Sequence, residues 1–218
     1  SVLMKHIMHH MKSIIPVAVV ISCSEESNNF YREFVPNAFV YTHFSVDIIR
    51  RIIARQKRVI NDPNVKNPWC LLVLDDCMGD TKLFSDAVIS EFFKNSRHWK
   101  ITSLWANQYI YDFNPTIRTS IDGVFMFRSS YPNYVRMYNN FASSIPSLAI
   151  FIDLMEGITD NFTCMYIHNK GLTTNHWEDS IYYFKADENL PSFVFGSEQY
   201  RKFSQERALD WKSSHKRP

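Results

Sequence analysis

The sequence is poor in the residues and runs that mark several classes of protein. Its 218 residues include five glycines and nine prolines, too few for a collagen, a flexible linker or a low-complexity chain. Its four cysteines lie far apart and form no C-x-x-C pair, which argues against a thiolate zinc site and a disulfide scaffold and fits a reducing compartment. These absences leave the composition of an ordinary globular domain.

Long apolar runs are also absent. The longest, residues 14–21, is interrupted by Pro16 and is far shorter than the roughly 20 residues that a membrane helix needs. No basic-then-apolar signal peptide opens the chain. We therefore expect neither a membrane span nor secretion. Because the formal net charge is only +2, composition alone favours neither nucleic acid nor a membrane surface as a partner.

The chain alternates short apolar runs with amphipathic segments. Strand-like runs occupy residues 17–22, 70–75, 101–106 and 123–128. Apolar residues recur at helical spacing over residues 1–15, 45–60 and 83–95. This alternation predicts an α/β domain with a mostly parallel sheet and helices on both faces.

The pattern changes after residue 130. Helices are expected near 135–141 and 147–157, strands at 163–168 and 181–185, and a final helix that frays into a basic tail. We therefore predict a core over residues 1–130, a further part of the same domain over 131–200, and a basic polar tail over 201–218.

Two carboxylates, Asp75 and Asp76, directly follow the apolar run at 71–74. Open α/β sheets place ligands at the carboxyl ends of their strands. In a P-loop NTPase this is the Walker B position, where the first carboxylate helps to hold Mg²⁺ and the second polarises the attacking water. The alternative is that the two residues only end a strand and cap the next turn.

The next strand-like run is bracketed by an arginine and an amide. Arg97 precedes the run at 101–106, and Gln108 follows it. An amide at that strand tip is placed to sense a γ-phosphate, and an arginine before the strand could face a neighbouring subunit. The alternatives are a solvated loop amide for Gln108 and, for Arg97, a cation favoured by the dipole at a helix C-terminus.

A phosphate-binding loop of the form G-x-x-x-x-G-K-[ST] is absent. The first glycine is Gly79, and Lys5 lies inside the first predicted helix. Ser1, followed by a helix and a buried strand, is what remains of such a loop cut between its Lys and its Ser. A serine left by cloning or processing is the alternative.

With these motifs in order, residues 71–128 resemble the DNA-packaging ATPases of nucleocytoplasmic large DNA viruses, the poxvirus-type branch of the FtsK/HerA superfamily of P-loop NTPases. The matching segments are LLVLDDCMGD at 71–80, SRH at 96–98, Gln108 after the next strand, and PTIRTSID at 115–122 before the strand at 123–128. The resemblance implies a RecA/ASCE-like fold that lacks its first, P-loop strand here.

The resemblance also implies ATP and Mg²⁺ as cofactors and a role for each candidate residue. Ser1 and Asp75 would hold Mg²⁺, with Ser1 also at the nucleotide, and Asp76 would orient or deprotonate the water. Gln108 would report the γ-phosphate. Arg97 would act on the neighbouring subunit's nucleotide, with Arg118 as the alternative.

The implied activity is an ATP-driven motor for viral DNA packaging. Its implied partners are double-stranded DNA, copies of itself in a homo-oligomeric ring, and viral capsid or inner-membrane proteins, in a host cytoplasmic viral factory or the virion. Candidate DNA contacts, for which a solvated face is the alternative, are Arg50, Arg51, Arg55, Lys57, Arg58, Lys212, His215, Lys216 and Arg217.

Because the phosphate-binding loop is missing, we expect the 218 residues alone to be an inactive C-terminal piece of such an ATPase. The rival from another class is a catalytically inactive NTPase-like module that binds partners. A helicase or a small kinase is disfavoured, since neither the further ordered helicase motifs nor an Arg-rich lid is present.

Overall fold

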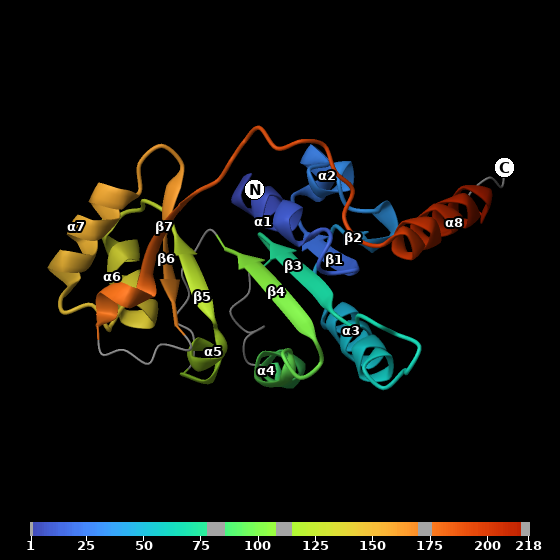
Figure 1. The fold of residues 1–218 in the computed structure, drawn as a ribbon, viewed down its shortest axis with the longest axis horizontal. Helices are drawn as coiled ribbons and strands as arrows, with labels where there is room; N and C mark the ends of the chain where they lie inside the picture. Colours follow the sequence, from blue (N-terminus) through green and yellow to red (C-terminus); the bar gives the residue numbers. More distant parts are fainter. Residues whose placement is uncertain (1, 78–85, 108–114, 170–175, 215–218) are drawn as a thin grey trace. The chain divides into compact units, whose positions relative to one another are not determined.

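The computed structural model describes residues 2–77, 86–107, 115–169 and 176–214 (Figure 1). The chain divides into two compact units. The first comprises residues 1–107 and 188–218, and the second comprises residues 108–187.

The first unit is built on a parallel sheet of four strands in the order β2-β1-β3-β4. The strands are β1 (Val17–Ser22), β2 (Val40–Tyr41), β3 (Cys70–Asp75) and β4 (Ile101–Ala106). The two central strands are buried along most of their length, as their unbroken apolar sequences require. The register places Ser22, Asp75 and Ala106 level with one another at the carboxyl end of the sheet.

Helices cover both faces of this sheet (Figure 1). On one face, Met4 and Met8 of α1 (Val2–Met11) pack in a core with Val20 and Val73. On the other face lie α3 (Val46–Val59), whose isoleucine side chains are buried, and α4 (Ala87–Asn95), in which Ile89 and Phe92 are buried. These observations confirm the predicted α/β class with a parallel sheet flanked by helices.

The link from β1 to β2 consists of short helical turns, and the C-terminal segment packs beside it. The turns are α2 (Glu25–Asn28), η1 (Tyr31–Glu33) and η2 (Asn37–Phe39). Residues after 187 return to this unit and end in α8 (Glu198–Ser214). The Tyr200 hydroxyl donates to the carbonyl of Ala18 at 2.7 Å, and its ring stacks on Phe39 with centroids 4.3 Å apart.

The second unit contains an antiparallel sheet in the order β5-β6-β7. Its strands are β5 (Gly123–Met126), β6 (Thr163–His168) and β7 (Ile181–Lys185), and its helices are α5 (Pro115–Ser120), α6 (Tyr131–Phe141), α7 (Leu148–Ile158) and the turn η4 (Trp177–Ser180). Phe151 and Met155 of α7 are fully buried in its core with Met165.

These units differ from the division predicted from the sequence. Of the strand predicted at 123–128, only residues 123–126 form β5, which pairs with β6 rather than with the parallel sheet, so the described boundary falls before 130. The final helix predicted in the basic segment from 201 is α8, which begins at Glu198 and is held to the first unit by hydrogen bonds of Tyr200 and Ser204. Within the described ranges, no helix is long and apolar enough to cross a bilayer.

The buried side chain of Gln56 joins α3 to the amino ends of β3 and β4. Its Nε2 donates to the carbonyls of Pro68 at 2.8 Å and Trp99 at 2.9 Å, and the side chain is fully buried. Both carbonyls would lose this donor if the amide were removed, and an unsatisfied buried acceptor costs about 1–3 kcal/mol.

Replacing Gln56 by leucine is therefore expected to lower the free energy of unfolding by about 1–3 kcal/mol while keeping the side-chain volume. Urea unfolding measures the change. Gln199→Leu, at an exposed position of α8, is the matched control and is expected to change stability by less than about 0.5 kcal/mol. Equal stabilities of the Gln56→Leu variant and the unsubstituted chain would show that the amide does not join these elements.

Candidate functional site

Asp75 ends the central strand β3 with its carboxylate on the sheet face that α1 covers. Along β3 the residues Leu71 and Val73 belong to that face's core, and Asp75 follows them at the same two-residue alternation. The side chain is half-buried. It therefore lies at the carboxyl end of the strands, where parallel α/β proteins bind ligands.

The chain turns sharply directly after Asp75. Asp76 adopts a left-handed backbone conformation with φ of 54°, which aspartate tolerates better than most residues. Its backbone N–H donates to the carbonyl of Ala106 at 3.1 Å, which ties the end of β3 to the end of β4. The side chain of Asp76 is exposed at this turn.

Tyr31 holds the carboxylate of Asp75. Its hydroxyl donates to Oδ2 of Asp75 at 2.8 Å, and only 1% of the tyrosine is exposed. Burial raises the pKa of the Tyr31 phenol well above its ordinary value of 10, and the charge of Asp75 and the hydrogen bond to it raise that pKa further. The phenol is therefore a permanent donor at neutral pH, and it fixes one oxygen of the carboxylate.

A second buried carboxylate orders the turn that carries Tyr31. Glu25 is fully buried, and its two oxygens accept from the backbone N–H groups of Tyr31 at 3.0 Å and Arg32 at 2.9 Å. A carboxylate at the start of a helical turn satisfies donors that the turn itself leaves open. Glu25, Tyr31 and Asp75 thus form a connected chain of contacts from the crossover, the segment that links β1 to β2, to the end of β3.

Neither Tyr31 nor Glu25 was identified from the sequence. The segment 25–31 reads as polar loop followed by aromatic core residues, and nothing in its spacing points to β3. Only the packing of the crossover over the sheet brings the Tyr31 hydroxyl to Asp75.

The carboxylate of Asp75 is placed where it could be a ligand of the metal in a metal–nucleotide complex. Magnesium at such sites is usually held by one or two carboxylates together with phosphate oxygens and water. Within the described part of the chain, no cluster of three or more His, Cys, Asp or Glu residues could hold a metal ion without such additional ligands.

Two thiols lie at the same end of the sheet. The Sγ atom of Cys77 is 3.0 Å from the carbonyl oxygen of Ile21 and 3.1 Å from that of Asp75. Burial, aided by the neighbouring Cys23 thiol, raises the pKa of Cys77 to about 12. No sequence pattern points to this pair, because the two residues come from the ends of different strands.

The other predicted site residues lie elsewhere or outside the described chain. Ser1, Gln108 and the basic residues His215, Lys216 and Arg217 are outside the described residues.

Arg97 is exposed in the turn between α4 and β4. That turn is at the amino end of the sheet, because Ile101 of β4 is level with Cys70 of β3. A six-residue strand spans about 20 Å, so Arg97 is not brought to Asp75 of the same chain. Arg118 belongs to the second unit, where its Nη1 lies 3.5 Å from the carbonyl oxygen of Asn139.

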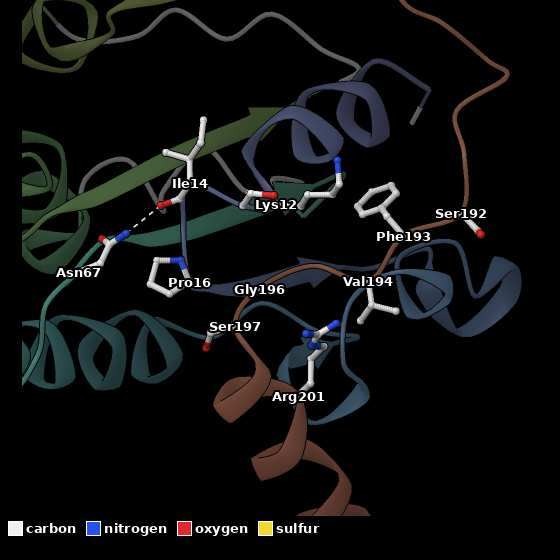
Figure 2. Close-up of a pocket in the computed structure, with 11 residues that line it drawn as sticks. Lys12, Ile14, Pro16, Asn67, Ser192, Phe193, Val194, Gly196, Ser197 and Arg201 are labelled. Atoms are coloured by element: carbon white, nitrogen blue, oxygen red, sulfur yellow. Dashed lines mark hydrogen bonds between the residues drawn. The ribbon is translucent and has the colours of Figure 1, made fainter.

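A shallow hollow of about 470 Å³ also opens at the amino end of β1 (Figure 2). Lys12, Phe193 and Arg201 contribute to its lining, and Asn67 donates to the carbonyl of Ile14 at 2.8 Å beside it. Because it lies at the opposite end of the strand from Ser22, it is separate from the Asp75 edge.

Viral proteins match almost the whole chain. Uncharacterized protein 015R of Frog virus 3 (isolate Goorha) is 41% identical over 206 residues, which cover 94% of this chain and 63% of that protein. Uncharacterized protein 088R of Invertebrate iridescent virus 3 is 38% identical over 205 residues, which cover 92% of this chain and 77% of that protein. The chain belongs to this family of viral proteins. No protein-family model matches it.

Solved structures of viral packaging enzymes share the fold of this family. The DNA-packaging ATPase B204 from Sulfolobus Turreted Icosahedral Virus superposes with a TM-score of 0.58 at 12% identity, over 86% of this chain and 91% of that one. The genome packaging NTPase B204 from Sulfolobus turreted icosahedral virus 2, in complex with ATP-gammaS, has a TM-score of 0.56 at 13% identity, over 84% and 89%. At these identities the likeness is one of fold. The chain spans less than two thirds of the frog virus protein.

Replacing Tyr31 by phenylalanine removes only the donor to Asp75. Because Asp75 is half-buried and water can replace part of the lost bond, we expect the free energy of unfolding at pH 7 to fall by about 1–2 kcal/mol. The folded-state pKa of Tyr31 is raised, so its contribution is fully present below the unfolded value of 10 and is lost as the pH rises above it.

Above pH 10, the unsubstituted chain is therefore expected to lose stability more steeply than Tyr31→Phe, by about 1.4 kcal/mol per pH unit for this one proton. Urea unfolding at a series of pH values measures both slopes. Tyr183→Phe, at a hydroxyl on a 76% exposed residue, is the control and should leave both quantities unchanged. Identical slopes for Tyr31→Phe and the unsubstituted chain would contradict the assigned contact.

Proposed function

We propose that this chain is part of an ATP-driven motor that packages viral DNA, a member of the poxvirus-type packaging branch of the FtsK/HerA superfamily. The observation that carries the proposal is Asp75, a half-buried carboxylate oriented by Tyr31 at the carboxyl end of the central strand of a packaging-NTPase fold. The ATP-gammaS complex of a structural neighbour supports nucleotide as the ligand class.

In this proposal Asp75 is the Walker B carboxylate. Magnesium, when bound, neutralises charge that develops on the phosphates during hydrolysis. Asp75 holds that ion directly or through a water, and the Tyr31 phenol keeps the carboxylate in one orientation. Asp76, exposed on the left-handed turn, orients or deprotonates the attacking water.

The phosphate-binding loop belongs, in this proposal, to sequence that precedes Ser1 in the full-length protein. No glycine precedes Gly79 in the 218 residues, so a Gly-rich cradle cannot be formed before β1. β4 is the outer strand of the parallel sheet among the described residues, with Leu104 and Trp105 half-buried. Its outer edge offers backbone groups to an additional strand. Ser1 then supplies the hydroxyl that contacts magnesium.

Arg97 is proposed to act in trans. Its place at the amino end of the sheet, about 20 Å from Asp75 along the strands, suits action on a neighbouring subunit's nucleotide rather than on its own. A homo-oligomeric ring is the assembly that such an arginine requires. Gln108 is proposed as the γ-phosphate sensor and Arg118 as the alternative arginine.

Double-stranded DNA is the proposed mechanical substrate, held mainly through its phosphates. Some of the basic residues of α3 are already paired, since Arg50 contacts Asp47 at 2.7 Å and Lys57 contacts Glu91 at 3.4 Å. We therefore assign no DNA-contacting residue. The proposed location is the host cytoplasmic viral factory or the virion, with capsid or inner-membrane proteins as further partners.

The full-length viral protein is the form in which to test the proposal. Arg97→Ala is expected to lower ATP turnover by about 10³–10⁵-fold while nucleotide affinity stays unchanged, because an arginine finger stabilises charge in the transition state. Asp75→Asn is expected to remove both turnover and magnesium-dependent nucleotide binding. Lys94→Ala removes an equally exposed cation from the neighbouring helix and should retain full turnover.

The 218-residue chain alone is used in a second experiment. Lacking a phosphate-binding loop, it is expected neither to hydrolyse ATP nor to bind it tightly, which calorimetry measures directly. Micromolar binding by this chain would contradict the proposed location of the loop. A full-length protein without ATPase activity would instead support an inactive interaction module.

A further inference from the structure

We propose that Cys23 and Cys77 are a site of reversible oxidation, at which a disulfide joins the ends of β1 and β3. The proposal concerns the two thiols and stands apart from nucleotide hydrolysis. Both cysteines are free in the structure.

The backbone brings the two residues together. Ser22 and Asp75 are level on neighbouring parallel strands, and such strands lie about 4.8 Å apart. Cys23 follows Ser22 directly. The left-handed residue Asp76 turns the chain at the end of β3, and Cys77 then directs its sulfur across to β1.

The sulfur of Cys77 occupies the gap between the strands. It lies 3.0 Å from the carbonyl oxygen of Ile21 on β1 and 3.1 Å from that of Asp75 on β3, and Ile21 is only two residues before Cys23. A sulfur already placed against the end of β1 needs little backbone movement to reach the thiol two residues along, and the Cα atoms of a disulfide typically lie about 4.4–6.8 Å apart.

Exposure divides the roles of the two thiols. Cys23 is exposed and meets an oxidant first, whereas Cys77 is only 7% exposed and is shielded from direct attack. Cys70 is buried at the opposite end of β3, about 20 Å from Cys77, and Cys164 is buried in the second unit. Of the three other cysteines, only Cys77 is therefore placed to form a disulfide with Cys23.

The reaction needs a peroxide as the oxidant. The Cys23 sulfur attacks the O–O bond, which breaks to give a sulfenic acid and one water. The Cys77 sulfur then attacks the sulfenic sulfur, the S–S bond forms, the S–O bond breaks, and the thiol proton leaves with the hydroxide as a second water. Overall, two thiols and one hydrogen peroxide give one disulfide and two waters. A dithiol reductant reverses the change.

Oxidation would alter the turn that carries Asp76. The Cys77 thiol proton, which is now directed at backbone carbonyls, is lost, and the turn becomes covalently tied to β1. The consequence for activity rests on the proposed function: if Asp75 and Asp76 serve hydrolysis, oxidation changes ATP turnover in the full-length protein.

The direct experiment treats the folded 218-residue chain with equimolar hydrogen peroxide, blocks remaining thiols with N-ethylmaleimide in denaturant, and measures the intact mass. Of the four cysteines, two should carry the label after oxidation and all four after reduction. Cleavage before Asp75 separates Cys70 from Cys77, so peptide masses identify the linked pair. Cys164→Ser is the control variant and should still form the disulfide.

Cys23→Ser is a mild change at an exposed position. Each of the two single variants, Cys23→Ser and Cys77→Ser, should abolish the loss of about 2 Da that accompanies disulfide formation. Three findings would overturn the proposal: a disulfide that involves Cys70 or Cys164, a dimer linked through Cys23, or Cys23 oxidised to sulfinic acid with Cys77 still reduced. This readout uses no nucleotide, so it fails or succeeds independently of the proposed ATPase activity.

Discussion

The arrangement of side chains at the carboxyl end of the parallel sheet depends on the hydrogen bond from Tyr31 to Asp75. This bond joins the crossover after β1 to the end of the central strand, across more than forty residues of sequence. Glu25 holds the tyrosine's backbone, the core of the α1-covered face holds its ring, and the phenol holds the carboxylate. A charge at a half-buried sheet end is expensive to leave without partners, and this bond stabilises it without neutralising it.

The two ends of the parallel sheet carry different chemistry. Asp75, Asp76 and the two thiols gather at the carboxyl end, whereas Arg97 and the hollow lined by Lys12 and Arg201 lie at the amino end. In a single chain these ends stay about 20 Å apart. In the proposed ring, the amino end of one subunit would meet the carboxyl end of the next.

The sequence was informative where a single local pattern decided the structure. The predominantly apolar segments at 17–22, 70–75 and 101–106 all form strands with the predicted bounds. The place of Asp75 at a strand end followed from such a run. The pairing of β5 was not predictable in the same way, because a four-residue apolar strand fits a parallel or an antiparallel sheet equally well. The contacts of Tyr31 and of Cys77 depend on tertiary packing between segments far apart in sequence, which no local pattern encodes.

The most direct test of the account is a structure of the full-length viral protein with Mg²⁺ and a non-hydrolysable ATP analogue. We predict the metal within about 4 Å of the Asp75 carboxylate, directly or through one water, with the Tyr31 hydroxyl still on the other carboxylate oxygen. A nucleotide bound away from the carboxyl end of β3, with Asp75 contacting neither metal nor metal-bound water, would contradict it.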